Sequence, residues 1–289
     1  MEVKEIKAKH ILVKCGIPGI DLVINPYIGC SFACKYCYAS FMGRFVGKQI
    51  SDWGNYVYAK INAPELLKRD IVKITNKGAG KEIFLSSVTD PYQGLEVKYT
   101  LTRQCLEILA DFGLVGIVSI LTKSDLVTRD IDIFKKLKRV LVGLTITSTN
   151  DSFSRYFEKY APPVSLRFEA LKKLNNSGIE TYAFIGPLLP HFVARSTELD
   201  RLFAKLKRTG TRNIFMEHLN LSTYIKSRLT EEMKGQESSL LKKFYSSQSM
   251  EYRSKLEEVI KDLIKKYDMR LLTDMVIFHS EFRRNNIEI

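Results

Sequence analysis

Short apolar runs alternate with amphipathic stretches along the chain from about residue 20 to residue 220. The runs are rich in Val, Ile, Leu and Phe, and those at residues 115–125 and 139–149 end in hydroxyl or charged side chains. Strands that are apolar on both faces are typical of a parallel sheet covered by helices on each side. The predicted strands fall at residues 21–25, 82–87, 115–125, 139–149, 180–190 and 212–221.

Amphipathic stretches separate these runs and predict the helices of β/α units. They fall at residues 62–76, 100–113, 165–178 and 197–210. Asn62 stands ahead of Pro64 and Glu65, which is a favourable start for the first helix. Gly113 is a typical stop for the second.

About six such units predict an α/β fold, a partial, open parallel β/α barrel. A doubly wound sheet is the alternative architecture. In a barrel, the residues at the carboxyl ends of the strands carry the chemistry, and polar residues gather there in this sequence.

The last part of the chain differs from this repeat. Residues 226–270 are polar and helix-like, and residues 270–278 resemble one last strand or a capping segment. No Pro/Gly/Ser-rich linker separates the parts. We therefore predict a barrel core over residues 1–225, with a C-terminal helical and strand extension over 226–289 packed on it.

The composition is that of a globular protein, with 45% hydrophobic residues among 289 and a net charge of +13. Residues 226–289 hold 13 basic and 11 acidic residues, so +11 of the net charge lies in residues 1–225. Such a balance favours an anionic partner such as nucleic acid, although a solvated basic face is equally compatible with it. No run reaches the roughly 18 apolar residues of a membrane span, and the N-terminus lacks a signal-peptide pattern. We expect a cytoplasmic protein with no membrane partner.

Three of the five cysteines, Cys30, Cys34 and Cys37, form a C-x3-C-x2-C pattern between a predicted strand and a helix. Three thiolates this close together can bind one face of an iron–sulfur cube and leave its fourth iron without a protein ligand. A zinc site is the alternative, and it would need a fourth ligand. The chain would then be a zinc- or iron–sulfur-binding nucleic-acid module without catalysis.

This cysteine pattern, with the aromatic Tyr36 before the third cysteine, resembles the radical S-adenosylmethionine (SAM) superfamily. The resemblance implies a [4Fe–4S] cluster on Cys30, Cys34 and Cys37, with SAM bound to the open iron. It further implies an external one-electron reductant of the flavodoxin or ferredoxin kind. Reductive cleavage of SAM would then give a 5′-deoxyadenosyl radical that abstracts hydrogen from a substrate.

Other motifs resemble the spore photoproduct lyase-related branch, whose members are often labelled DNA repair photolyases. These motifs are NPYIGC (25–30), KINAPELL (60–67), SVTDPY (87–92) and LTRQCLEIL (101–109). The resemblance covers about residues 20–220. It implies a lyase-like or other radical modification, with nucleic acid or peptide as the substrate.

The resemblance also implies a SAM pocket at the strand ends. Thr89 and Asp90 are candidates to meet the SAM amino group, although Asp-Pro is also a common turn start. Lys123 and Arg167 are candidates for the SAM carboxylate, because both are cations near strand ends and Arg has a fork geometry. Ser148 is a candidate for the ribose hydroxyls or the carboxylate. Tyr36 completes the predicted cofactor pocket.

The sequence departs from this branch at the position expected to quench the product radical. Spore photoproduct repair is thought to use a cysteine near the end of the strand after the cluster loop, but residues 85–90 contain none. Cys15 and Tyr92 are the predicted hydrogen donors, with Tyr38 as a further possibility. We predict that thymine-dimer repair is not the native activity.

Three further features have two interpretations each. The aromatic and basic stretch from Tyr38 to Tyr58 can stack on bases or pack the core. Cys105 shares the apolar face of its helix and is predicted to lie in the core. His218 can face the cavity or be a core histidine, and the second is favoured.

Overall fold

The computed structural model describes residues 1–190, 194–235 and 238–279. Its main sheet has eight strands in the order β11-β10-β9-β8-β7-β6-β3-β2. Six of them, β3 and β6 to β10, correspond to the six predicted strands, and every pairing along the sheet is parallel except that of the edge strand β2. The two edge strands β2 and β11 are not neighbours, so the barrel is open, as predicted.

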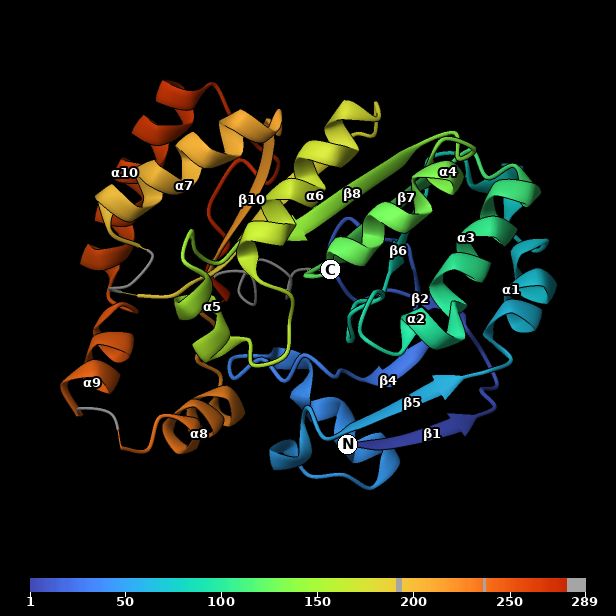
Figure 1. Cartoon of the computed structure of the whole chain (residues 1–289), viewed down its shortest axis with the longest axis horizontal. Helices are drawn as coiled ribbons and strands as arrows, with labels where there is room; N and C mark the ends of the chain where they lie inside the picture. The colour runs from blue at the N-terminus through green and yellow to red at the C-terminus, as the bar shows by residue number, and fades with distance from the viewer. Residues whose placement is uncertain (191–193, 236–237, 280–289) are drawn as a thin grey trace, which may run out of the picture.

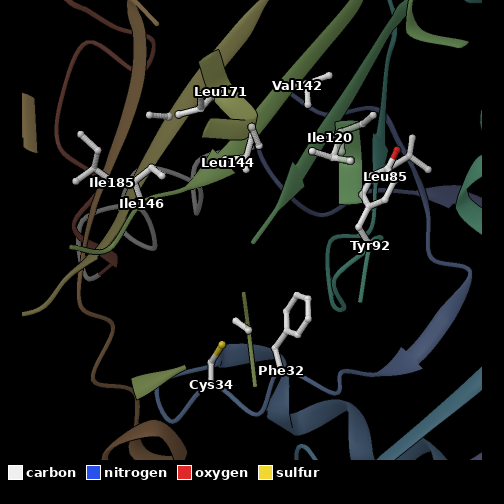
Figure 2. Close-up of a cluster of buried hydrophobic side chains, with 14 of the residues drawn as sticks. Phe32, Cys34, Leu85, Tyr92, Ile120, Val142, Leu144, Ile146, Leu171 and Ile185 are labelled. Atoms are coloured by element: carbon white, nitrogen blue, oxygen red, sulfur yellow. The ribbon is translucent and has the colours of Figure 1, made fainter. Parts of the chain in front are cut away.

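The bounds of the main-sheet strands follow the apolar runs closely. They are β2 Leu12–Lys14, β3 Leu22–Ile24, β6 Glu82–Leu85, β7 Ile117–Thr122, β8 Val140–Thr145, β9 Thr181–Leu188, β10 Asn213–His218 and β11 Arg270–Leu271. Leu85, Ile120 and Leu144 are buried on successive strands, and Figure 2 shows them in one hydrophobic cluster.

Helices follow the strands and cover the sheet (Figure 1). They are α1 Ala63–Ile71, α2 Glu96–Tyr99, α3 Leu101–Phe112, α4 Ile131–Phe134, α5 Asp151–Phe157, α6 Val164–Asn176 and α7 Ser196–Thr209. Short 3-10 helices are η1 Tyr38–Val46, η2 Ile50–Asp52, η3 Thr75–Gly78 and η4 Asp125–Asp130. The helix predicted at 62–76 is shorter than expected: it ends at Ile71, and a 3-10 turn with Asn76 and Lys77 at positive φ follows.

A second, three-stranded sheet was not predicted. It consists of β1 Glu2–Ile6, β5 Tyr56–Lys60 and β4 Tyr27–Gly29, in the order β1-β5-β4. Strand β4 ends directly before Cys30. The small sheet therefore fixes the start of the cysteine loop, which lies across from the ends of the barrel strands in Figure 2.

The C-terminal part contains α8 Thr223–Glu232, α9 Ser238–Ser246 and α10 Met250–Tyr267. Helix α10 is joined to α7 by a Lys266–Asp200 ion pair, and the Lys207 ammonium donates to the carbonyl of Tyr267 at 2.9 Å. Strand β11 then pairs with β10, and a bridge between Glu217 and Ile277 continues this parallel pairing. The predicted last strand is thus present at the sheet edge. None of the described helices has the length and apolar character needed to cross a membrane.

Candidate functional site

The cysteine loop brings the three predicted cluster ligands together. Cys30 and Cys34 are buried and Cys37 is half-buried, and all three are free thiols. The Cys37 amide donates to the Cys34 carbonyl at 3.2 Å, which closes a turn between them. Burial raises the pKa of Cys30, and the charges of Asp90, Cys34 and Cys37 raise it further. The loop thus holds three cysteines within eight residues, two of them buried and one half-buried.

Three cysteines supply three ligands and leave the fourth position open. A structural zinc site needs four protein ligands, whereas in a cube each of the three thiolates binds a different iron and the fourth iron is left without a protein ligand. Within the described residues, no group of three or more His, Cys, Asp or Glu side chains is placed to hold one metal ion. Burial also raises the pKa of Cys34 to about 12, so the bare thiol is protonated and a bound metal would have to displace the proton.

The cysteine loop is fastened to the segment that follows α5. Cys34 forms an isolated antiparallel bridge with Glu158. The Lys35 amide donates to the Phe157 carbonyl at 2.9 Å, and the Tyr160 amide donates to the Phe32 carbonyl at 3.1 Å. These contacts join the loop to a segment more than 120 residues away, and the sequence pattern did not indicate them.

Glu158 is the centre of this junction and was missed by the sequence analysis. Its side chain is 1% exposed. The carboxylate accepts hydrogen bonds from the Tyr36 hydroxyl, from Thr147 Oγ1 at 3.2 Å and from Arg167 Nη2. Burial alone would raise the pKa of Glu158, but Arg167 and Lys123 outweigh it and the pKa is lowered. Glu158 is therefore an anion inside the protein.

Arg167 lies in the interior of the protein and is wholly buried. Its guanidinium pairs with Glu158 and donates to the carbonyl oxygens of Pro162 (2.8 and 3.1 Å) and Thr145 (3.1 Å). The acidic partner that the sequence did not reveal is thus Glu158. Because protein acceptors engage Arg167 on all three nitrogens, this geometry favours a structural role over the predicted contact with the SAM carboxylate.

Lys123 directly follows β7 and remains available. Its backbone amide donates to Asp90 Oδ2 at 2.9 Å, and its ammonium lies 5.8 Å from the centre of the Tyr36 ring. Among the residues that the structure describes, no hydrogen-bond or ion-pair partner holds this ammonium. Burial would lower the pKa of Lys123, but Cys34 and Glu158 outweigh it and the pKa is raised. Lys123 is thus a charged donor beside the cysteine loop.

Thr89 and Asp90 occupy the turn after β6. The Asp90 carboxylate accepts from the Tyr92 amide (2.9 Å), from Thr122 Oγ1 (2.6 Å) and from the Lys123 amide. The Thr89 hydroxyl donates to the Gly29 carbonyl, next to Cys30. These contacts agree with the turn interpretation of Asp90, and they place both residues where β6, β7 and the cysteine loop meet.

The hydroxyls of two other predicted residues, Tyr92 and Ser148, form hydrogen bonds within the protein. The Tyr92 hydroxyl donates to the buried Asp130 at 3.0 Å, and its ring is 1% exposed. This geometry corrects the expectation that Tyr92 donates a hydrogen atom, because a fully buried phenol engaged by a carboxylate does not reach a substrate. Ser148 is buried after β8, and its hydroxyl accepts from the Asn150 amide at 3.0 Å, which shapes the turn before α5.

Cys15 lies beside the start of β3, where its amide donates to the Asp21 carbonyl at 3.0 Å. It is half-buried and stands at the opposite end of that strand from the cysteine loop. Tyr38 is 44% exposed and donates to the Ser87 carbonyl.

Two further predictions placed side chains in the core, and both are confirmed. Cys105 is fully buried on α3, as predicted. His218 is buried against the rings of Tyr252 and Phe278, which confirms the core interpretation.

The aromatic and basic stretch is divided between the core and the surface. Trp53, Tyr56 and Tyr58 are core residues. Phe45 is 62% exposed, however, and the Arg44 guanidinium lies over its ring at 4.7 Å.

The sequence profile of the radical SAM superfamily matches residues 24–195. An uncharacterized protein of Methanocaldococcus jannaschii is 39% identical over 221 residues, which cover 76% of this chain and 79% of that protein. The radical SAM Nalpha-GlyT isomerase of Pseudomonas phage M6 is 24% identical over 200 residues, which cover 68% of this chain and 39% of that protein.

Solved structures with a similar fold include spore photoproduct lyase complexed with a dinucleoside spore photoproduct. The TM-score is 0.70 at 13% identity, covering 92% of this chain and 79% of that one. Streptococcus suis SuiB bound to S-adenosylmethionine has a TM-score of 0.56 at 14% identity, covering 86% of this chain and 48% of that one. These similarities confirm the partial-barrel fold.

Proposed function

Because the chain belongs to the radical SAM superfamily, we propose that it abstracts a hydrogen atom from a nucleic-acid substrate. Membership in the superfamily makes it an enzyme whose cofactors are a [4Fe–4S] cluster and SAM. The chemistry supplied by the bound, reduced cluster is the cleavage of SAM to methionine and a 5′-deoxyadenosyl radical, which removes hydrogen from the substrate. An external reductant supplies the electron, and we propose a flavodoxin- or ferredoxin-like protein for this role.

The observation that carries the proposal is the buried cysteine loop with one free ammonium beside it. Cys30, Cys34 and Cys37 supply three ligands to a cube, so that one iron is left for SAM. Lys123 is held at the strand end by its backbone bond to Asp90, and its ammonium is not engaged by any described residue. It is therefore the group that we assign to the SAM carboxylate, with Tyr36 beside it.

Three features support nucleic acid as the substrate class. The net charge of +11 lies in residues 1–225, which contain the barrel. Arg44 and the exposed Phe45 form an aromatic and cationic surface on η1, which follows directly after the cysteine loop. Aromatic rings stack on bases, and cations bind phosphates. In addition, the similar spore photoproduct lyase was solved with a dinucleoside, whereas the less similar SuiB was also solved with a precursor peptide.

The cofactor assignment is tested by anaerobic reconstitution of the full chain. We expect about four irons per chain and, after reduction with SAM present, equal amounts of methionine and 5′-deoxyadenosine. A colourless protein that binds one zinc and does not cleave SAM would contradict the assignment.

The substrate class is tested by deuterium transfer. Nucleic acids and proteins are prepared separately from cells that lack this protein and were grown in deuterated medium, and each is incubated with the reduced holoenzyme. Deuterium should appear in 5′-deoxyadenosine with the nucleic-acid fraction. Its appearance with the protein fraction alone would show that the substrate is a peptide.

Binding to nucleic acid offers a second test. Log affinity for a single-stranded oligonucleotide should fall linearly with log salt, because each neutralised phosphate releases counterions. Arg44→Ala and Phe45→Ala should weaken binding, and Arg201→Ala, at a solvent-exposed site on α7, should leave it unchanged. Equal effects of Arg44→Ala and Arg201→Ala would remove η1 from the binding surface.

We further propose that spore photoproduct is not the native substrate. Ser86 and Ser87 follow β6, where a thiol would be required, and a serine O–H bond is too strong to donate hydrogen to a carbon radical at a useful rate. Multiple-turnover reversal of a spore-photoproduct oligonucleotide to two thymines would contradict this. Loss of such turnover in Cys15→Ala would then identify Cys15 as the donor.

A further inference from the structure

Glu158 holds the cysteine loop by both its backbone and its side chain. Its segment pairs with the loop on either side of Cys34. The Lys35 amide donates to the Phe157 carbonyl, and the Tyr160 amide donates to the Phe32 carbonyl. The side chain accepts from the hydroxyl of Tyr36, which stands directly before Cys37. One residue thus fixes two positions within the C-x3-C-x2-C pattern.

Glu158 also brings a charge into the interior beside the thiols. Its partner Arg167 is wholly buried and Glu158 is 1% exposed, so bulk solvent has little access to either group. The carboxylate and the guanidinium carry opposite charges, and the Cys34–Glu158 bridge and the Tyr36–Glu158 hydrogen bond hold the pair beside the loop. An electron added at the loop would therefore interact with both Glu158 and Arg167.

We propose that Glu158 is a positioning residue that, together with Arg167, sets the reduction potential of the [4Fe–4S] cluster. The inference rests on the proposed assignment of the cluster to Cys30, Cys34 and Cys37. Reduction adds one electron from the external donor to the cluster, with no bond made or broken. A neighbouring negative charge opposes that electron and a positive charge favours it, and local charge is one of the factors that set cluster potentials.

A purely structural role makes a different prediction. If Glu158 and Arg167 only hold the loop in place, removing either one loosens the same junction, and the potential shifts in the same direction. If their charges act on the cluster, the two removals shift the potential in opposite directions. The sign of the two shifts therefore distinguishes the roles.

The experiment is a redox titration of the anaerobically reconstituted holoenzyme without SAM, followed by electron paramagnetic resonance. We expect a more positive midpoint potential in Glu158→Gln and a more negative one in Arg167→Met. Each change should be about tenfold in the reduction equilibrium, or roughly 59 mV for one electron. The double variant should return toward the wild-type value.

Glu96→Gln is the matched control, because Glu96 is an equally buried glutamate paired with Arg129 in a different network. Its potential should equal that of the wild type. If Glu158→Gln does not fold, Arg167→Lys and Arg167→Met provide the test, since lysine keeps the charge and the wild-type potential while methionine shifts it.

Shifts of the same sign in Glu158→Gln and Arg167→Met, or no shift in either, would overturn the inference while leaving the cluster assignment intact. A wild-type protein without the cluster signal would overturn the assignment and the inference with it.

Discussion

Among the described residues, two groups have the same composition: each joins a tyrosine, a buried glutamate and an arginine, which is wholly buried in one group and 25% exposed in the other. One, which we call the loop triad, consists of Tyr36, Glu158 and Arg167. The other, which we call the helix triad, consists of Tyr27, Glu96 and Arg129. In both, the tyrosine hydroxyl donates to the carboxylate, the arginine pairs with it, and the glutamate is at most 1% exposed.

The two triads differ in what lies next to them. In the helix triad, Glu96 also accepts from the Thr102 amide at 3.0 Å, and Arg129 pairs with Asp130 as well. These contacts join β4 to α3 and η4, so the role of the helix triad is structural. In the loop triad, the neighbours are the thiol of Cys34 and the ammonium of Lys123. The same set of side chains thus joins secondary-structure elements in one place and lies beside the proposed cluster ligands in the other.

The largest effect is expected from substitution of the three cysteines of the loop that the loop triad contacts. Cys30→Ala, Cys34→Ala or Cys37→Ala should each remove most of the iron and all SAM cleavage, because two thiolates do not hold the cube. Iron content and 5′-deoxyadenosine are the measurements. Cys105→Ala and Cys15→Ala are the controls and should retain iron. Full iron and activity in any variant of the first set would refute the ligand assignment.

Removing the glutamate charge should destabilise the protein more in the loop triad than in the helix triad. Breaking a buried ion pair leaves an uncompensated charge and costs about 3–5 kcal/mol, and this applies to the wholly buried Arg167, whereas Arg129 is 25% exposed and keeps Asp130 as a partner. We therefore expect Glu158→Gln to lower the free energy of unfolding of the metal-free protein more than Glu96→Gln does in urea titrations. A much smaller loss in Glu158→Gln would show that the loop triad is not formed in the metal-free protein.

As the pH falls from neutral, the first loss of stability should come from His218 at the end of β10, and not from either triad. Burial lowers the pKa of His218 from 6.5 to about 4. The unfolded state therefore binds a proton first, and stability is lost as the pH falls from 6.5 toward 4, by about 3 kcal/mol in total. The pKa of Glu158 is also lowered, so its contribution is present above its ordinary value of 4.5 and is lost only at lower pH.

Urea titrations at several pH values measure this dependence. The slope between pH 6.5 and 4 should be reduced in His218→Gln and retained in Glu158→Gln. The reverse pattern would contradict the assignment of the two groups.

A smaller effect is expected at the ammonium beside the loop triad. Lys123→Ala should weaken SAM binding about ten- to hundredfold, since a hydrogen bond between charged groups contributes roughly 1.5–3 kcal/mol. Equilibrium binding to the reconstituted protein measures this. Arg167→Lys, which keeps the charge in the triad, should change SAM affinity less than Lys123→Ala does. If Arg167→Lys has the larger effect, Arg167 is the carboxylate ligand after all.

The features that depend on local sequence pattern were predicted from the sequence. The six strands follow from apolar runs, α3 and α7 from the amphipathic period, and the cysteine triplet from spacing within eight residues. Composition and order along the chain are sufficient for such features.

Features that depend on long-range pairing were not predicted. Glu158 lies in an irregular segment after α5, and nothing near it in sequence indicates that it will bridge to Cys34. Arg167 therefore had no visible acidic partner. Strand β1 is only 5 residues long and polar, so the small sheet was not predicted, although it places Cys30. The orientation of Tyr92 likewise depends on Asp130, which is 38 residues away.

Binding of SAM to the one iron that the three cysteines leave open can be observed by electron–nuclear double resonance on the reduced holoenzyme, with SAM labelled by 15N at the amino group and 17O at the carboxylate. We predict hyperfine coupling of both labels to the cluster, present in the wild type and weakened for the carboxylate label in Lys123→Ala. Bound SAM with no coupling to either label would contradict this assignment.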